Sequence, residues 1–345
     1  MGSILLTAAA SVLVFGGVIF IHELGHFLTA KASGIKVNEF ALGMGPALLH
    51  FKKKETQYSW RLFPIGGYVS MEGEDEESDV PGSFQRAPIS RRILVTVAGA
   101  VMNLILGFAV LIGIVCMQDA ILSRTVGAFY EGAATQEQGL QVGDTILAVN
   151  GRRCFVANDV SYEFARTQNN TADLTVLRDG QKVQLNGIAF DTREAEDGTR
   201  YMVIDFMVYP VEKTVGSVLA EAGRWTLSLA RMVMLSLTDL VTGRIPVNNL
   251  SGPVGIVTAI SQATSMGWEP LLLLLALISV NLGVFNLLPI PALDGGRLLF
   301  LVLEAIRRKP IPQKYEAAIN AAGFIFLFGV MIFATFNDIT RMLPS

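Results

Sequence analysis

The stretch ILVTVAGAVMNLILGFAVLIGIVC, which runs from Ile93 to Cys116, contains no charged residue. A helix needs about 20 apolar residues to cross the hydrocarbon core of a membrane, and this stretch exceeds that length. Three more stretches, residues 4–27, 270–293 and 317–337, are almost as free of charge. The sequence therefore predicts a polytopic α-helical membrane protein with about four transmembrane helices.

The composition of the whole chain agrees with a membrane protein. Of the 345 residues, 51% are hydrophobic and only 17% are charged, whereas soluble domains carry about 25% charged residues. The formal net charge of −3 gives no electrostatic reason to expect nucleic acid as a partner. Two cysteines, Cys116 and Cys154, are too few for a disulfide framework.

Lysine and arginine gather in two loops, at residues 29–91 and after the third apolar stretch at 297–314. Cytoplasmic loops are enriched in these residues, so we expect both loops in the cytoplasm and both termini outside. The long segment between the second and third spans is then extracytoplasmic. The first stretch lacks a basic region ahead of it, which favours a retained span over a cleaved signal peptide.

The predicted outer segment, residues 123–211, has the pattern of a small β-rich domain. Short apolar runs such as Thr145–Val149, Leu174–Leu177 and Met202–Met207 alternate with Gly, Asn and Asp turn signals. The string Gly139–Gly151 resembles the PDZ signature, in which a Gly-Asp turn leads into a strand that ends in an Asn-Gly turn. Such domains bind peptides by strand addition, and a spacer or size filter is the alternative.

Two segments between the spans leave their placement open. Phe63–Val69 combines a turn signal with β-forming residues, which predicts either a re-entrant hairpin that lines a wet cavity or an ordinary surface hairpin. Trp225–Leu240 is apolar at helical spacing, so it could lie flat on the membrane or pack against the helix bundle. Of these two, packing is the simpler expectation.

The string His22-Glu23-Leu24-Gly25-His26 lies at the inner end of the first span. Residues four apart share one face of a helix, so both imidazoles can point at one metal ion with Glu23 beside them. Histidine pairs at this spacing suit Zn²⁺, and the carboxylate can accept a proton from water. Polar residues that merely end a span are the alternative, although titratable groups at membrane depth usually mark functional sites.

A catalytic zinc site usually has a third protein ligand. The remaining histidine, His50, falls in the basic inner loop, so Asp294 is the best candidate. It follows two prolines that must interrupt the third span, and the two glycines after it allow close approach of the backbone. Taken alone, this motif is equally consistent with a solvated aspartate at the end of a helix.

Together these motifs resemble the site-2 protease family of intramembrane zinc metalloproteases, and most closely its bacterial RseP-like branch. The resemblance covers nearly the whole chain, because the inner hairpin, one outer PDZ-like segment and the string Asn286–Gly296 all have counterparts. Ser251–Gly255 also matches a segment common in the family. The chain departs from the family in lacking a proline before Asn103 and in having one PDZ-like segment where many relatives have two.

The resemblance implies a role for each matching residue. His22, His26 and Asp294 would be the zinc ligands, and Glu23 the catalytic acid/base. The other residues would contact substrate: Asn286, Asn281 and Asn103 on the spans, and Gly66, Gly67 and Tyr68 on the membrane-dipping hairpin.

We therefore expect a zinc-dependent endopeptidase that cleaves transmembrane segments during regulated intramembrane proteolysis. Its partners would be the lipid bilayer and single-span membrane proteins already trimmed by another protease, such as anti-sigma factors or signal-peptide remnants. The expected location is the bacterial plasma membrane, with the active site toward the cytoplasm and the PDZ domain outside. A divalent-metal transporter and a non-catalytic scaffold that displays a PDZ domain are the alternatives.

The expected parts of the chain follow from these motifs. They are a first transmembrane helix with HExxH (1–28), a cytoplasmic re-entrant β region (29–91), a second transmembrane helix (92–117), a PDZ domain (123–211), an amphipathic linker (212–269), a third transmembrane helix (270–296) and a fourth (317–338).

Overall fold

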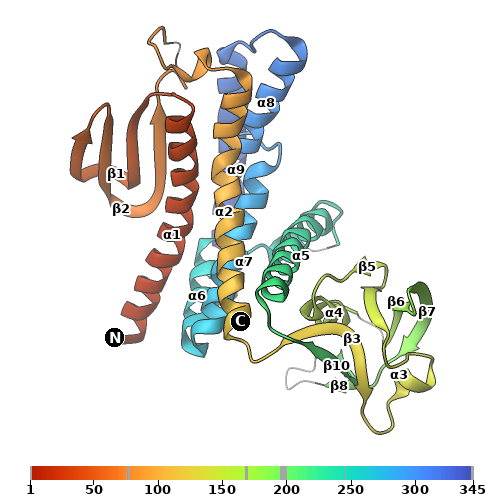
Figure 1. The fold of residues 1–345 in the computed structure, drawn as a ribbon. Helices are drawn as coiled ribbons and strands as arrows, with labels where there is room; N and C mark the ends of the chain where they lie inside the picture. The colour runs from red at the N-terminus through yellow and green to blue at the C-terminus, as the bar shows by residue number, and fades with distance from the viewer. Residues whose placement is uncertain are drawn as a thin grey trace. The chain divides into compact units, whose positions relative to one another are not determined.

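The computed structural model describes residues 2–74, 76, 78–167, 170–194, 200–244 and 246–342. The chain divides into two compact units (Figure 1). Unit 1 consists of residues 1–110 and 232–345, and unit 2 consists of residues 111–231.

Four helices in the described part of the chain are long and apolar enough to cross a membrane. They are α1 (Gly2–Ala32), α2 (Ile89–Met117), α7 (Trp268–Leu287) and α9 (Gln313–Met342). The predicted number of spans is thus matched, although α1 continues past the expected end of the first span. The third expected span, 270–296, is interrupted, because α7 ends at Leu287 and the next helix, α8 (Asp294–Arg307), begins only after both prolines.

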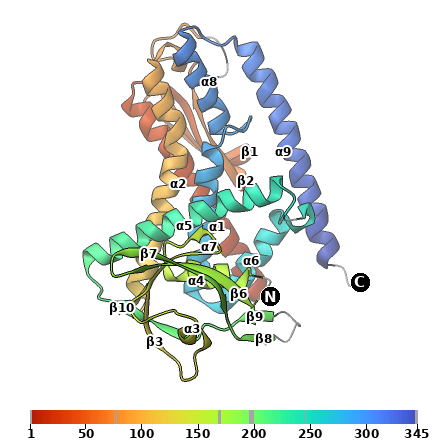
Figure 2. The same cartoon turned by 90° about the vertical axis from the view of Figure 1, so that its right-hand side faces the viewer.

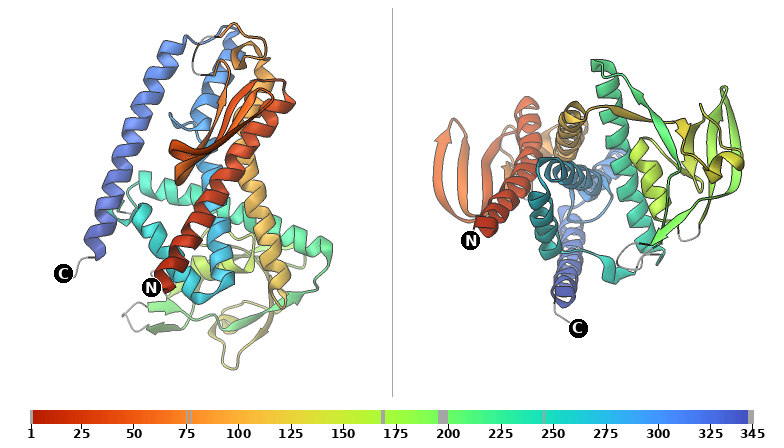
Figure 3. Two further views of the ribbon diagram at one scale, coloured as in Figure 1. Left: turned by 90° about the vertical axis from the view of Figure 1, so that its left-hand side faces the viewer. Right: turned by 90° about the horizontal axis from the view of Figure 1, so that it is seen from below.

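A long hairpin of two strands, β1 (Val37–Lys53) and β2 (Thr56–Met71), lies beside α1 (Figure 3). The chain reverses at Lys54, which has a φ of 57°. Residues 63–69, where the sequence indicated a turn, instead lie inside β2, and Gly66 adopts a φ of 87° there. The hairpin is therefore larger than the sequence indicated.

The hairpin folds back on itself. Phe40 pairs with Tyr58 on one side and with Val69 on the other, and Tyr58 also pairs with Phe51. The four segments consequently lie in the order 67–71, 37–42, 56–60 and 49–53 across one coiled sheet. Within the described ladder, the segment 67–71 has a partner on one side only, and so forms an edge of the sheet.

Helix α6 (Pro253–Met266) packs between α1, α7 and α9 in unit 1 (Figure 2). Ile260 of α6 is fully buried against Ala10 and Val14 of α1. The preceding helix, α5 (Val215–Val241), continues from unit 2 into unit 1. Two short 3-10 helices, Phe84–Arg86 and Val247–Asn249, also belong to unit 1.

Unit 2 is a β-rich domain, as the sequence predicted. Its main sheet has the order β10-β3-β4-β6-β7, with β5 paired to β4, and β8 and β9 form a separate pair. The strands are β3 (Ile121–Phe129), β4 (Thr145–Val149), β5 (Arg152–Arg153), β6 (Thr171–Arg178), β7 (Gln181–Ala189), β8 (Thr192–Glu194), β9 (Arg200–Met202) and β10 (Phe206–Val211). Two helices, α3 (Ala134–Glu137) and α4 (Ala157–Ala165), accompany the sheet.

The turns of the PDZ-like string occur where the sequence placed them. Gly143 has a φ of 94°, and the next residue, Asp144, is fully buried and paired with Arg178. Asn150 and Gly151, with φ values of 49° and 73°, close the turn after β4. The expected strand over Met202–Met207 is wrong, because residues 203–205 separate β9 from β10. The carboxylate of Asp205 instead accepts hydrogen bonds from the backbone N–H and the hydroxyl group of Thr135.

Candidate metal centre

Helix α1 presents two imidazoles on one face. His22 and His26 lie four residues apart, and their exposed fractions are only 9% and 8%. Glu23 belongs to the same turn and is half-buried. An apolar helix holds these polar side chains in the interior of unit 1, where they require polar partners.

Asp294 reaches the histidines from the first turn of α8. The two glycines that follow it allow α8 to begin against the loop that leaves α7. A Cβ atom on Gly295 would lie 1.9 Å from the carbonyl oxygen of Leu288, and one on Gly296 would lie 2.5 Å from that of Ile290. No other residue type fits these contacts, so the two glycines allow the close packing that sets the position of Asp294.

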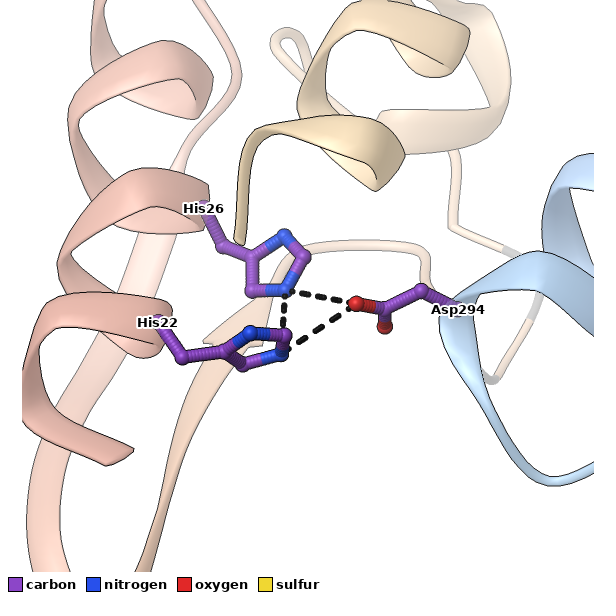
Figure 4. A group of neighbouring side chains, drawn as sticks. All are labelled: His22, His26 and Asp294. Atoms are coloured by element: carbon purple, nitrogen blue, oxygen red, sulfur yellow. Dashed lines mark hydrogen bonds and ion pairs between the residues drawn. The ribbon is translucent and has the colours of Figure 1, made fainter. Parts of the chain in front are cut away.

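Three potential metal-donor atoms, one from each of His22, His26 and Asp294, lie close together (Figure 4). The Nε2 atoms of His22 and His26 lie 3.2 Å apart, and they lie 3.2 and 3.3 Å from Oδ2 of Asp294. Tetrahedral zinc with bonds of about 2.0–2.1 Å places neighbouring donor atoms about 3.3–3.4 Å apart. Oδ2 of Asp294 is buried and has no hydrogen-bond partner among the described residues. The donor set therefore fits a zinc ion in both chemistry and spacing.

Helix α2 supports the two histidines from the other side. The carbonyl oxygen of Val95 lies 2.8 Å from Nδ1 of His26, and the side-chain amide of Asn103 lies 3.2 Å from Nδ1 of His22. Gly99 lies between them in the sequence, and a Cβ atom there would come within 2.3 Å of Nε2 of His26. The imidazoles thus occupy space that α2 leaves open at this glycine.

A cavity of about 170 Å³ opens beside the donor atoms. It is lined by Glu23 and the three donor residues, by Tyr68, Val69 and Met71 of β2, by Val95 and Thr96 of α2, and by Glu74 and Arg297. A Cβ atom on Gly67 would lie 3.2 Å from Cγ of Glu23, so the edge segment of the hairpin runs directly past this carboxylate. The cavity thus combines a candidate metal-binding cluster, a carboxylate and the edge of a sheet.

The structure brings some of the expected site residues together and leaves others apart. His22, Glu23, His26, Asp294 and Tyr68 share the cavity. The expected substrate-binding asparagines do not line it within the described residues: Asn281 is exposed on α7, Asn286 is 7% exposed, and Asn103 is fully buried against His22.

Two residues in the cavity wall were not found from the sequence. Arg297 forms an ion pair with Glu74 and also approaches Glu316, with 3.6 Å between its Nε and the carboxylate. Arg297 stands three residues after Asp294, on the same face of α8, and this spacing was the only signal in the sequence. Glu74 follows the hairpin and gave no signal of its own.

Comparison with known proteins identifies the family. The sequence pattern of peptidase family M50 matches residues 10–330, which is most of the chain. The chain belongs to peptidase family M50. This M50 peptidase is 36% identical over 329 residues to a protein of Clostridium acetobutylicum, covering 95% of the chain and 96% of that relative.

Two further relatives carry informative names. The regulator of sigma-W protease RasP of Bacillus subtilis is 32% identical, and the zinc metalloprotease RasP of Bacillus licheniformis is 33% identical. Each alignment covers 97% of this M50 peptidase and 99% of the relative. The protein is thus a zinc metalloprotease of the site-2 protease family, which confirms the resemblance, the enzyme class and the cofactor inferred from its sequence.

Proposed function

We propose that this M50 peptidase hydrolyses peptide bonds in or near the transmembrane segments of single-span membrane proteins. The observation that carries the proposal is the position of the donor cluster. Two of its three side chains project from α1, a helix apolar enough to cross a membrane, and both are buried there. A site within a membrane-spanning helix is accessible to membrane-embedded substrates rather than to soluble ones.

His22, His26 and Asp294 are the zinc ligands in this proposal, since their donor atoms converge at zinc spacing. A zinc ion held by these three residues would supply Lewis acidity toward the scissile carbonyl group and toward water. Glu23 accepts the proton of the attacking water and delivers it to the leaving amide nitrogen. Its carboxylate shares the cavity with the three ligands, within reach of a bond placed over them.

The hairpin edge is the second part of the proposed substrate site. A transmembrane helix hides its carbonyl groups in its own hydrogen bonds, so a substrate must be extended before it is cut. The segment 67–71, including Gly67 and Tyr68, offers an open strand edge beside Glu23, with Gly66 at the bend that leads into it. Strand addition at this edge gives the unwound substrate new partners.

The far end of the hairpin supports its placement against lipid. Seven large apolar side chains are exposed there: Met44, Leu48, Leu49, Phe51, Trp60, Leu62 and Phe63. Large apolar side chains exposed in such number on one hairpin favour an apolar partner over water. We assign this surface to the bilayer, so the hairpin is re-entrant in this proposal.

Asn286 and Asn281 are the proposed contacts to the substrate backbone from α7. Asn281 is exposed and directly accessible, whereas Asn286 needs a shift of its neighbours before a substrate can reach it.

Unit 2 is the proposed extracytoplasmic PDZ domain. Its string Gly139–Gly151 and the edge position of β10 support strand addition by a peptide. A domain of this kind could equally admit only substrates whose outer part another protease has removed. The basic loops favour a cytoplasmic active site, so the enzyme is proposed to lie in a bacterial plasma membrane. There it would release cytoplasmic factors from substrates such as anti-sigma factors or signal-peptide remnants.

The test compares the purified wild type with Glu23→Gln in detergent, using a panel of single-span peptides. Mass spectrometry maps the cuts with and without a zinc chelator, and zinc is added back afterwards. Cuts inside the apolar span that disappear with the mutation and with the chelator support the proposal. Cuts that survive Glu23→Gln, or that fall only in soluble flanks, would overturn it.

A further inference from the structure

Each ligand imidazole has a second ring nitrogen that points away from the cluster, and α2 contacts both of these atoms. Nδ1 of His26 meets the carbonyl oxygen of Val95 at 2.8 Å. Nδ1 of His22 meets the side-chain amide of Asn103, with the amide nitrogen 3.2 Å away. Asn103 has no exposed surface, and its Oδ1 atom is buried without a hydrogen-bond partner among the described residues.

The chemistry of a zinc-bound imidazole decides what these contacts must be. A neutral imidazole that offers Nε2 to a metal carries its proton on Nδ1, and that N–H requires an acceptor. Val95 supplies a carbonyl oxygen to His26. With the amide nitrogen of Asn103 toward His22, the N–H of the amide would instead face the Nδ1–H of the imidazole, and neither group could accept a hydrogen bond.

A half-turn of the Asn103 amide removes this conflict. It exchanges oxygen and nitrogen while the rest of the side chain stays in place. Oδ1, which has no partner, would then accept the Nδ1–H of His22. The same rotation therefore satisfies the buried oxygen and selects the tautomer in which Nε2 of His22 is free to bind zinc.

We propose that Asn103 is a positioning residue of the zinc site, which fixes His22 as an Nε2 ligand by accepting its Nδ1–H. The inference rests on His22 as a ligand in the proposed function. Asn103 does not line the cavity and is closed to solvent, so it acts through His22 rather than on the substrate. This replaces the substrate contact expected for Asn103 from the sequence.

The surroundings hold Asn103 in place for this role. Ser279 of α7 donates a hydrogen bond to the backbone carbonyl of Asn103 over 2.8 Å, and both residues are fully buried. Gly99, one turn earlier on α2, leaves the room that both imidazoles need. The contact thus lies in a packed interface of three helices, where a ligand ring has little freedom to rotate.

The test measures zinc affinity by competition with a chromogenic chelator, which needs no substrate. Asn103→Leu keeps the branching of the side chain but has no acceptor, and loss of such a partner typically weakens metal binding 10–100-fold. Asn103→Asp keeps an acceptor, so it should bind zinc about tenfold more tightly than Asn103→Leu. Gly113→Ala, on the same helix at a position where a methyl group meets nothing within 4 Å, should retain wild-type affinity.

A fourth variant, His22→Ala, separates the two proposals. If it binds zinc like the wild type, the proposed ligand set fails. If His22→Ala loses zinc while Asn103→Leu retains it, only the role of Asn103 fails. Equal zinc loss in Asn103→Leu and Asn103→Asp would also overturn that role, because it would show that packing rather than the acceptor matters.

Discussion

The carboxylate of Asp338, near the end of α9, accepts a hydrogen bond from the backbone N–H of Gly255, in the first turn of α6, over 2.7 Å. The same oxygen accepts a second bond, from Gly252, over 2.9 Å. The first N–H groups of a helix have no partner within the helix. Asp338 is 4% exposed, so it caps α6 from a neighbouring helix. This contact gives the segment Ser251–Gly255 a physical role.

Replacing Asp338 with alanine should destabilise the protein, because two N–H groups at the start of α6, one of them buried, lose their acceptor. The expected loss in free energy of unfolding is about 1–3 kcal/mol. Thermal unfolding in detergent, followed by circular dichroism, measures it. Thr340→Ala is the control on the same helix, since among the described residues the Thr340 hydroxyl donates to Asn337, within its own turn. An unchanged midpoint for Asp338→Ala would show that water replaces the carboxylate.

Gly99→Ala should lower the zinc content of the purified enzyme. The added methyl group would meet His26 at 2.3 Å and His22 at 2.7 Å, so the rings must move from the positions in which their donor atoms converge. Metal analysis by mass spectrometry gives the zinc-to-protein ratio. Gly113→Ala is the control on the same helix, where a methyl group meets nothing within 4 Å. A full complement of zinc in Gly99→Ala contradicts the expected crowding.

Cys154 should resist alkylation in the folded protein. Burial, followed by the nearby carboxylate of Asp159, raises the pKa of its thiol to about 12, so only about one molecule in ten thousand carries the reactive thiolate at pH 8. In a Cys116→Ser background, iodoacetamide should label Cys154 only after unfolding in guanidinium chloride. Peptide mass spectrometry measures the labelled fraction at pH 8. Equal labelling rates before and after unfolding would mean that this thiol is accessible in the fold.

Glu72 should make the stability of the enzyme sensitive to acid. Hydrogen bonds from Ser78, Lys36 and Asn38 lower the pKa of its carboxyl group to about 2. A group whose pKa falls on folding stabilises the native state above its unfolded pKa, near 4.5, and loses that effect as the pH falls toward 2. Glu72→Gln should therefore flatten the pH dependence of the unfolding midpoint between about 4.5 and 2.

The control for this measurement is Glu137→Gln, at the end of α3, for which no hydrogen bond is recorded within the described residues. Its unfolding midpoint should follow the wild-type pH dependence. An unchanged slope in Glu72→Gln would assign the acid sensitivity to other carboxyl groups.

Much of the membrane architecture could be predicted from the sequence because it depends on local composition. A run of apolar residues long enough to span a bilayer is visible without knowledge of its neighbours, and Pro289 and Pro291 interrupt a helix wherever they occur. The hairpin could not be predicted in the same way. Its bends at Gly43, Gly45 and Gly66 are set by the pairing of distant segments.

The site divides along a similar line. His22, Glu23 and His26 share one helix turn, so their spacing alone indicated a metal site. Gly99 and Asn103 contact the two histidines because of how α2 packs against α1, and the sequence does not reveal that packing directly. Asn103 was therefore recognised as a residue of interest, but its contact with His22 could not be predicted.

The metal centre joins parts of the chain that are far apart in sequence. Two of the proposed ligands belong to α1, near the beginning, and the third belongs to α8, near the end. An ion bound by all three acts as a removable cross-link between these helices, and free ligand at 100 times its Kd stabilises a fold by about 2.7 kcal/mol. The lifetime of this enzyme should therefore follow the zinc supply of its cell, since scarcity would loosen the helix bundle as well as stop the chemistry.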